Sequence, residues 1–146
     1  MQRECYRFGG VTFAIEADAP IERSRMCAPF HAADGAPEHT IRLHFDDRPP
    51  VPPETAQHRG AVWRWQSGAG RHLLGQYGTP DKPPRFTYAV TRGAHTEVTF
   101  ANAYRAGASV RAVLEAAGLF DIFAARGMLV LHSAYIVART GVAILF

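Results

Sequence analysis

Apolar and polar residues alternate along most of the chain up to Ala101, and this period of two is typical of β-strands with one buried face. The clearest case is residues 40–45, where Ile41 and Leu43 would face a core while Arg42 and His44 would face water. The same alternation predicts further strands, at residues 61–65, 72–77, 86–91 and 96–100.

Clusters of glycine and proline separate these strands. Gly9 and Gly10 stand between apolar runs at residues 6–8 and 11–15, and a two-glycine loop adopts the positive φ angles of a tight hairpin turn. The Gly-Ala-Gly run at residues 68–70 is interpreted as another hairpin turn, because no lysine and no helix follow it. The proline-rich segments 49–53 and 79–84 are expected to be loops. These features predict an antiparallel meander.

The period changes to that of a helix at Ser109. Val110, Val113 and Leu114 recur at helical spacing behind a serine that can accept hydrogen bonds from first-turn amides. Gly118 is expected to end or bend this helix, and residues 119–126 predict a second helical piece. Apolar strands are then expected at residues 129–137 and 142–146, joined by a turn near Gly141.

The predicted fold class is therefore α+β. Residues 1–101 would form a mainly antiparallel, β-rich domain, and residues 102–127 a helical connector. Residues 128–146 would form a β-hairpin that leads into a further α/β domain. Because residues 142–146 read as a buried strand, the chain is expected to be the first part of a longer protein.

The amino-acid composition argues against a nucleic-acid-binding, membrane or redox function. The formal net charge is +3, the arginines are scattered and Lys82 is the only lysine, which argues against a nucleic-acid binder. The longest apolar runs are only a few residues and the start lacks a secretory signal, so we expect a cytoplasmic protein with no membrane partner. Cys5 and Cys27 are interpreted as small apolar side chains rather than redox groups.

Common catalytic and metal-binding motifs are absent from the sequence. We assign no catalytic residue and no metal site to this chain, and no histidine pair has the spacing that places two ligands on one helix face. All seven histidines are expected at the surface or at strand edges: His31, His39, His44, His58, His72, His95 and His132.

The last part of the chain resembles a known family. Residues 129–146 read LVLHSAYIVARTGVAILF, with His132 followed by a small residue and with a glycine turn at Gly141 into an apolar strand. This segment is similar to the one that precedes the phosphate-binding loop in HPr kinase/phosphorylase-like proteins. The resemblance covers about eighteen residues strongly, and the helix from Ser109 onward fits it loosely.

The resemblance implies an ATP-binding P-loop protein, with the loop expected after Phe146. The intact protein would bind ATP and magnesium and would act as a kinase on a protein or small-molecule hydroxyl, whereas this chain alone would bind no nucleotide. His132 would hold the loop or a neighbouring strand in place through a hydrogen bond, or would be a buried histidine bonded to backbone. Ser133 would have a similar supporting or packing role.

Two other interpretations stay open from the residues alone. The chain could be a stand-alone β-sheet module that binds a ligand or a protein without catalysis, or a purely structural or interaction subunit, and it could form an oligomer. Five aromatic residues would either form a binding surface or pack into the core: Trp63, Trp65, Tyr77, Phe86 and Tyr88.

Overall fold

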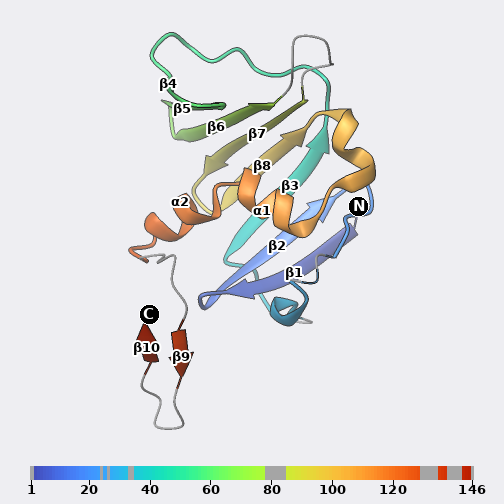
Figure 1. The fold of residues 1–146 in the computed structure, drawn as a ribbon, viewed down its shortest axis with the longest axis vertical. Helices are drawn as coiled ribbons and strands as arrows, with labels where there is room; N and C mark the ends of the chain where they lie inside the picture. The colour runs from blue at the N-terminus through green and yellow to red at the C-terminus, as the bar shows by residue number, and fades with distance from the viewer. Residues whose placement is uncertain are drawn as a thin grey trace.

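The computed structural model describes residues 2–23, 25, 27–32, 35–77, 85–128, 135–137 and 143–145. Within these residues the chain forms a twisted eight-stranded sheet with two short α-helices on one face (Figure 1). The strands of this sheet are β1 (Gln2–Phe8), β2 (Val11–Ala17), β3 (His39–Phe45), β4 (Gln57–Arg59), β5 (Val62–Ser67), β6 (Gly70–Tyr77), β7 (Arg85–Arg92) and β8 (His95–Phe100).

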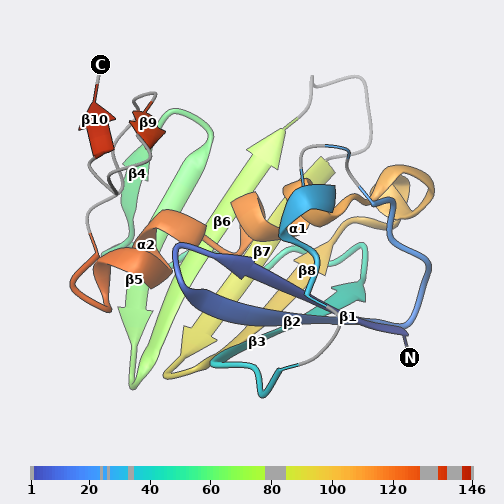
Figure 2. The same cartoon turned by 90° about the horizontal axis from the view of Figure 1, so that it is seen from below.

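The order of the strands across the sheet is β1-β2-β3-β8-β7-β6-β5-β4, so β1 and β4 are the two edges (Figure 1). Strands β4 to β8 follow one another as an antiparallel meander, and β1 and β2 form the hairpin predicted around Gly9 and Gly10. Figure 2 shows the β5–β6 turn and the β7–β8 turn at the same end of the sheet. The predicted turn at residues 68–70 is confirmed, and Gly68 has the positive φ of +56° that it requires.

Strand β3 corrects the prediction of a continuous antiparallel meander. It lies between β2 and β8 and pairs parallel with both, whereas the other five strand pairings in this described sheet are antiparallel. A parallel pair needs a crossover connection, which residues 18–38 supply; they include the short 3-10 helix η1 (Ala28–Phe30). Alternation of apolar residues specifies which face a side chain takes but not the direction of the neighbouring strand.

The helices begin and end close to the residues predicted from the sequence. A 3-10 helix, η2 (Asn102–Gly107), leads to α1 (Val110–Ala116), whose first turn is capped by the Ser109 hydroxyl accepting a hydrogen bond from the Ala112 amide at 3.2 Å. Gly118, with φ +70°, ends α1 and starts α2 (Leu119–Ala124). The second helix is two residues shorter than predicted.

One apolar core lies between the helices and the sheet. It joins side chains from β1, β2, β3, β7 and β8 to the inner sides of α1 and α2, so strands and helices share one buried cluster. Phe13 of β2 is fully buried, and its ring meets Phe123 of α2 edge to face at 5.9 Å. The division into separate units at residue 101 stays a prediction.

The predicted C-terminal hairpin is confirmed where the structure describes it. Strand β9 (Tyr135–Val137) pairs antiparallel with β10 (Ala143–Leu145), with Ile144 opposite Ile136. The predicted turn residue Gly141 lies outside the described residues. The same is true of His132 and Ser133, the two residues to which the resemblance assigns a supporting role. Among the described helices, none combines the length and the hydrophobicity that spanning a bilayer requires.

Candidate functional site

The helix-facing side of the sheet divides into two regions. We call β1, β2, β3 and β8 the inner half and β4 to β7 the outer half. In the inner half this side is filled mainly by apolar residues such as Ile15, Leu43 and Val98, which the helices cover. In the outer half the same side carries polar residues among the apolar ones. A hollow lies there beside α2.

This hollow, which we call the α2 groove, has a volume of about 450 Å³. Its floor comes from β5, β6 and β7, and its wall from the start of α2. A volume of this size is in the range of pockets that hold small ligands. The side chains that define its character are Arg64, Gln66, Arg71, Leu73, Thr91 and Asp121.

Arg71 is the central cation of the α2 groove. By the exposure of the whole residue, it is the one arginine of the described residues that is partly buried. The side chain of Arg126 is also partly covered, at 27% exposed, but it pairs with Glu38. The Arg71 Nη1 donates a hydrogen bond of 3.1 Å to the backbone carbonyl of Asp121. No carboxylate of the described residues pairs with Arg71, although buried charges are normally paired.

Arg64 and Asp121 form an ion pair at the rim of the groove. The Arg64 Nη1 lies 3.2 Å from one carboxylate oxygen of Asp121 and 3.3 Å from the other. The Arg64 side chain is 57% exposed and that of Asp121 is 35% exposed, so water screens much of their attraction. Gly118 leaves room for the Asp121 carboxylate, because a Cβ atom at position 118 would lie only 3.1 Å from it. The charged side chains around the groove are therefore two cations and one anion.

A buried chain of hydrogen bonds leads from the inner half to the groove. The His39 Nε2 lies 2.8 Å from the Thr96 hydroxyl, which lies 2.9 Å from the Thr91 hydroxyl. Thr96, Thr91 and Arg71 are successive register partners across β8, β7 and β6, and His39 lies two residues before Ile41, the partner of Thr96 on β3. A line of polar side chains therefore crosses the sheet beneath the helical layer and ends in the groove.

The burial of His39 corrects the prediction that every histidine lies at the surface or at a strand edge. Only 2% of its surface is exposed, because position 39 is in phase with the inward-facing Ile41 and Leu43. Burial lowers the pKa of His39 to about 4, with the charge of Arg126 adding to the effect. The imidazole is therefore neutral near pH 7, as expected for a ring whose charged form would be desolvated.

A second hollow continues the groove along α1. It has a volume of about 370 Å³ and shares Arg64 and Leu73 with the first. Its lining is more apolar and includes Tyr77, Tyr104 and the small helix residues Ala112 and Ala116. Gly75 leaves room for the Tyr77 side chain, since a Cβ atom at position 75 would lie 2.7 Å from the Tyr77 hydroxyl.

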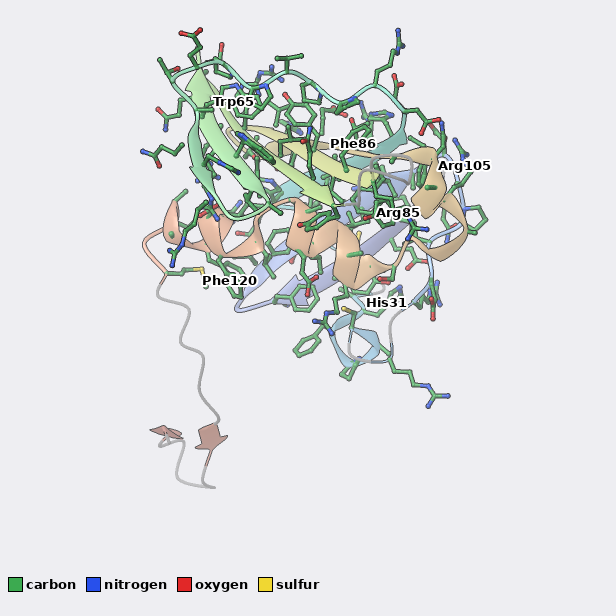
Figure 3. The ribbon with its side chains drawn as sticks, turned by 45° about the horizontal axis from the view of Figure 1, so that its top comes forward. His31, Trp65, Arg85, Phe86, Arg105 and Phe120 are labelled. Atoms are coloured by element: carbon green, nitrogen blue, oxygen red, sulfur yellow. The ribbon has the colours of Figure 1, made fainter. Side chains whose placement is uncertain are left out.

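The opposite face of the outer half carries four of the five aromatic residues considered as a binding surface, whereas the fifth, Tyr77, lines the hollow beside α1. Phe86 is fully buried with Leu74, and Trp63, Trp65 and Tyr88 pack against that cluster. Figure 3 shows Trp65 and Phe86 on the other side of the sheet from Phe120 of α2. Most of these rings therefore pack in a second small core, while Tyr77 is half exposed.

His72 belongs to this aromatic layer. Its ring stacks on Trp65 with centroids 4.8 Å apart, and its Nδ1 lies 2.6 Å from the Tyr88 hydroxyl. Burial lowers the pKa of His72, and the nearby Arg92 acts in the same direction. Stacking and hydrogen bonding thus give this histidine a packing role.

The residues of the α2 groove were missed from the sequence. Arg71 and Thr91 were not singled out, although a polar residue in phase with inward apolar positions was visible at Arg71, two residues before Leu73. His132 and Ser133, the supporting residues that the resemblance implies, cannot be placed in the groove because they lie outside the described residues. Within the described part of the chain, no group of three or more His, Cys, Asp or Glu side chains is arranged to hold a metal ion.

Comparisons with known proteins give no match for this chain: no family model fits the sequence, and no curated protein or solved structure is significantly similar to it.

Proposed function

We propose that this chain is the amino-terminal part of a cytoplasmic ATP-binding P-loop protein that resembles HPr kinase, with the phosphate-binding loop following Phe146. The observation that carries the proposal is the antiparallel pairing of β9 with β10. The resemblance of residues 129–146 to the family implies two adjacent strands at this point of the chain. A strand that runs into a glycine-rich loop and a helix aims backbone amides at nucleotide phosphates.

In the intact protein, the expected loop would hold the phosphates of ATP, and its lysine together with magnesium would neutralise charge on the transferred group. The acceptor would be the hydroxyl of a protein or of a small molecule. The 146-residue chain contains no G-x-x-x-x-G-K-[ST] sequence. It would therefore supply a supporting module, with His132 and Ser133 beside the loop, and no catalysis of its own.

The coding sequence downstream of Phe146 tests this proposal. We expect a G-x-x-x-x-G-K-[ST] motif within about a dozen codons. A protein extended through that loop and its helix should bind ATP with magnesium in calorimetric titration, and the 146-residue chain should not. A natural stop codon directly after Phe146, or micromolar ATP binding by the 146-residue chain, would contradict the proposal.

A second proposed function is that the eight-stranded module binds a ligand without catalysis. The observation that favours it is the pair of adjoining hollows between the helices and the outer half of the sheet. This function is compatible with the first, since a kinase-like protein needs surfaces that select its acceptor. Titration of the chain with the small probes named below tests it without any nucleotide.

A further inference from the structure

We infer that the α2 groove binds a small molecule that carries an oxyanion, a carboxylate or a phosphate, and that Arg71 makes the principal contact. This inference rests on the proposed ligand-binding function and is independent of the P-loop proposal. It assigns a chemical class of ligand and a set of contact residues to a hollow of about 450 Å³.

The charge of Arg71 is the first reason. A guanidinium carries five N–H donors, and the described residues use one of them, in the bond to the Asp121 carbonyl. The other arginines of the described residues are exposed as whole residues, and Arg126, whose side chain is partly covered, pairs with the Glu38 carboxylate. Arg71 has lost part of its contact with water without gaining a carboxylate partner. A bound oxyanion would supply the missing partner, because the planar guanidinium can form two parallel hydrogen bonds to a carboxylate or a phosphate.

The residues beside Arg71 are further donors. Thr91 is its direct partner on β7, and Gln66 is its partner on β5, so all three side chains lie on the same face of the sheet. The Thr91 hydroxyl is held by Thr96, which His39 holds in turn. When the neutral His39 carries its proton on Nε2, it donates to Thr96. Thr96 then donates to Thr91, and the Thr91 proton is free to point toward the groove.

Arg64 adds a second positive charge at the rim. Asp121 already bonds to Arg64 at 3.2 Å, so the one carboxylate of the groove is directed at the rim and not at Arg71. A ligand anion at Arg71 would therefore meet a site with a net positive charge. The more apolar hollow beside α1 is continuous with the groove through Leu73 and would take an apolar body attached to the anion.

The inference is tested with three probes of similar shape: phenylacetate, phenyl phosphate and the neutral benzyl alcohol. Each is titrated calorimetrically into the 146-residue chain at low ionic strength. We expect at least one of the two anions to bind with a dissociation constant in roughly the millimolar range or tighter, and the alcohol to bind at least about tenfold more weakly. Binding of phenylacetate alone identifies a carboxylate site, and binding of phenyl phosphate alone identifies a phosphate site.

Two variants and one control test whether Arg71 makes the principal contact with the anion. Arg71→Gln should weaken binding of the anion by at least about tenfold, and Arg71→Lys should weaken it less because the charge remains. The control is Arg92→Gln, which removes an exposed arginine at the end of β7 on the opposite face and should leave binding unchanged. Should Arg71→Gln fail to fold, the Arg71 side-chain N–H resonance of the unmodified chain should still shift on addition of the anion.

Three results would overturn the inference: no binding of either anion, equal binding of benzyl alcohol, or equal loss of affinity in Arg71→Gln and Arg92→Gln. An Arg71 resonance that does not move at a saturating anion concentration would overturn it as well. None of these results bears on the downstream P-loop sequence, so failure of the groove and failure of the P-loop proposal are distinguishable.

Discussion

The inner and outer halves of the sheet are built from strands with the same alternation, yet their helix-facing sides differ in what they hold. In the inner half, Phe13, Ile15 and Leu43 are sealed beneath α1 and α2. In the outer half, Arg71 and Thr91 occupy equivalent inward positions beside a hollow. The apolar packing of the inner half therefore stabilises the module, whereas the outer half has polar groups at inward positions where a ligand can contact them.

The largest expected effect comes from the inner half. Phe13→Ala removes a fully buried ring that contacts Phe123, and it should lower the free energy of unfolding by about 3–5 kcal/mol. Urea denaturation measures the change. The control Phe120→Ala removes a side chain that is 67% exposed and should change the stability by less than about 0.5 kcal/mol. Similar costs for the two variants would contradict the assignment of the core.

His39 begins the hydrogen-bond chain that leads from the inner half to the outer half, and it should make stability depend on pH. Its pKa is about 4 in the folded chain and near the ordinary value of 6.5 when unfolded. Because the unfolded chain takes up the proton first, stability is fully present above about pH 6.5 and falls as the pH drops toward 4, by up to roughly 3 kcal/mol. Denaturation of the unmodified chain and of His39→Gln across this range measures the effect.

The His39→Gln chain should show a flatter pH dependence than the unmodified chain over this window. The matched control is His58→Gln, which makes the same substitution at an exposed histidine. An identical slope in the unmodified and His39→Gln chains would mean that His39 is protonated without cost in the folded state.

A smaller effect is expected at the start of α1. Ser109→Ala removes the hydroxyl that accepts a hydrogen bond from the Ala112 amide, and should cost about 1 kcal/mol of stability. Ser109→Asp should restore most of it, since aspartate also caps helices. Thermal or urea denaturation of the two variants checks the result, and equal stability of Ser109→Ala and the unmodified chain would contradict a role for the cap.

The smallest effect is expected in the outer half, at Arg71. Arg71→Met loses one hydrogen bond to the Asp121 carbonyl but also removes a partly buried charge without a carboxylate partner. The two changes oppose each other, so the free energy of unfolding should change by less than about 1 kcal/mol in either direction. Urea denaturation measures it. A loss of several kcal/mol would show that Arg71 is a structural residue of the core.

Much of the fold was predictable because local signals decide it. The turn at Gly9 and Gly10, the Ser109 cap and the break at Gly118 each depend on residues close in sequence, and all three predictions are confirmed. The parallel placement of β3 was not predictable, because it depends on the path of residues 18–38 and not on the pattern of β3 itself.

The candidate site was predictable only in part. His39 has the phase of an inward-facing residue, yet its partner Thr96 is distant in sequence, so alternation alone could not show that its hydrogen bond would be satisfied in the interior. Arg71 and Asp121 meet through the turn at Gly118 and the twist of the sheet, which no local motif encodes. Sites assembled from several strands in this way become visible only when the topology is known.

Amide chemical-shift mapping tests most directly the claim that the outer half is the ligand-binding side and the inner half the scaffold. The 146-residue chain, labelled with ¹⁵N, is titrated with phenylacetate and with phenyl phosphate while the resonances of all assigned strands are followed. We expect the largest shifts at Arg71, Leu73, Thr91 and Asp121, and we expect the resonances of β1 and β2 to stay unmoved. Shifts concentrated on the inner half or on the aromatic face of Trp63 and Trp65 would contradict the claim, as would the absence of any shift.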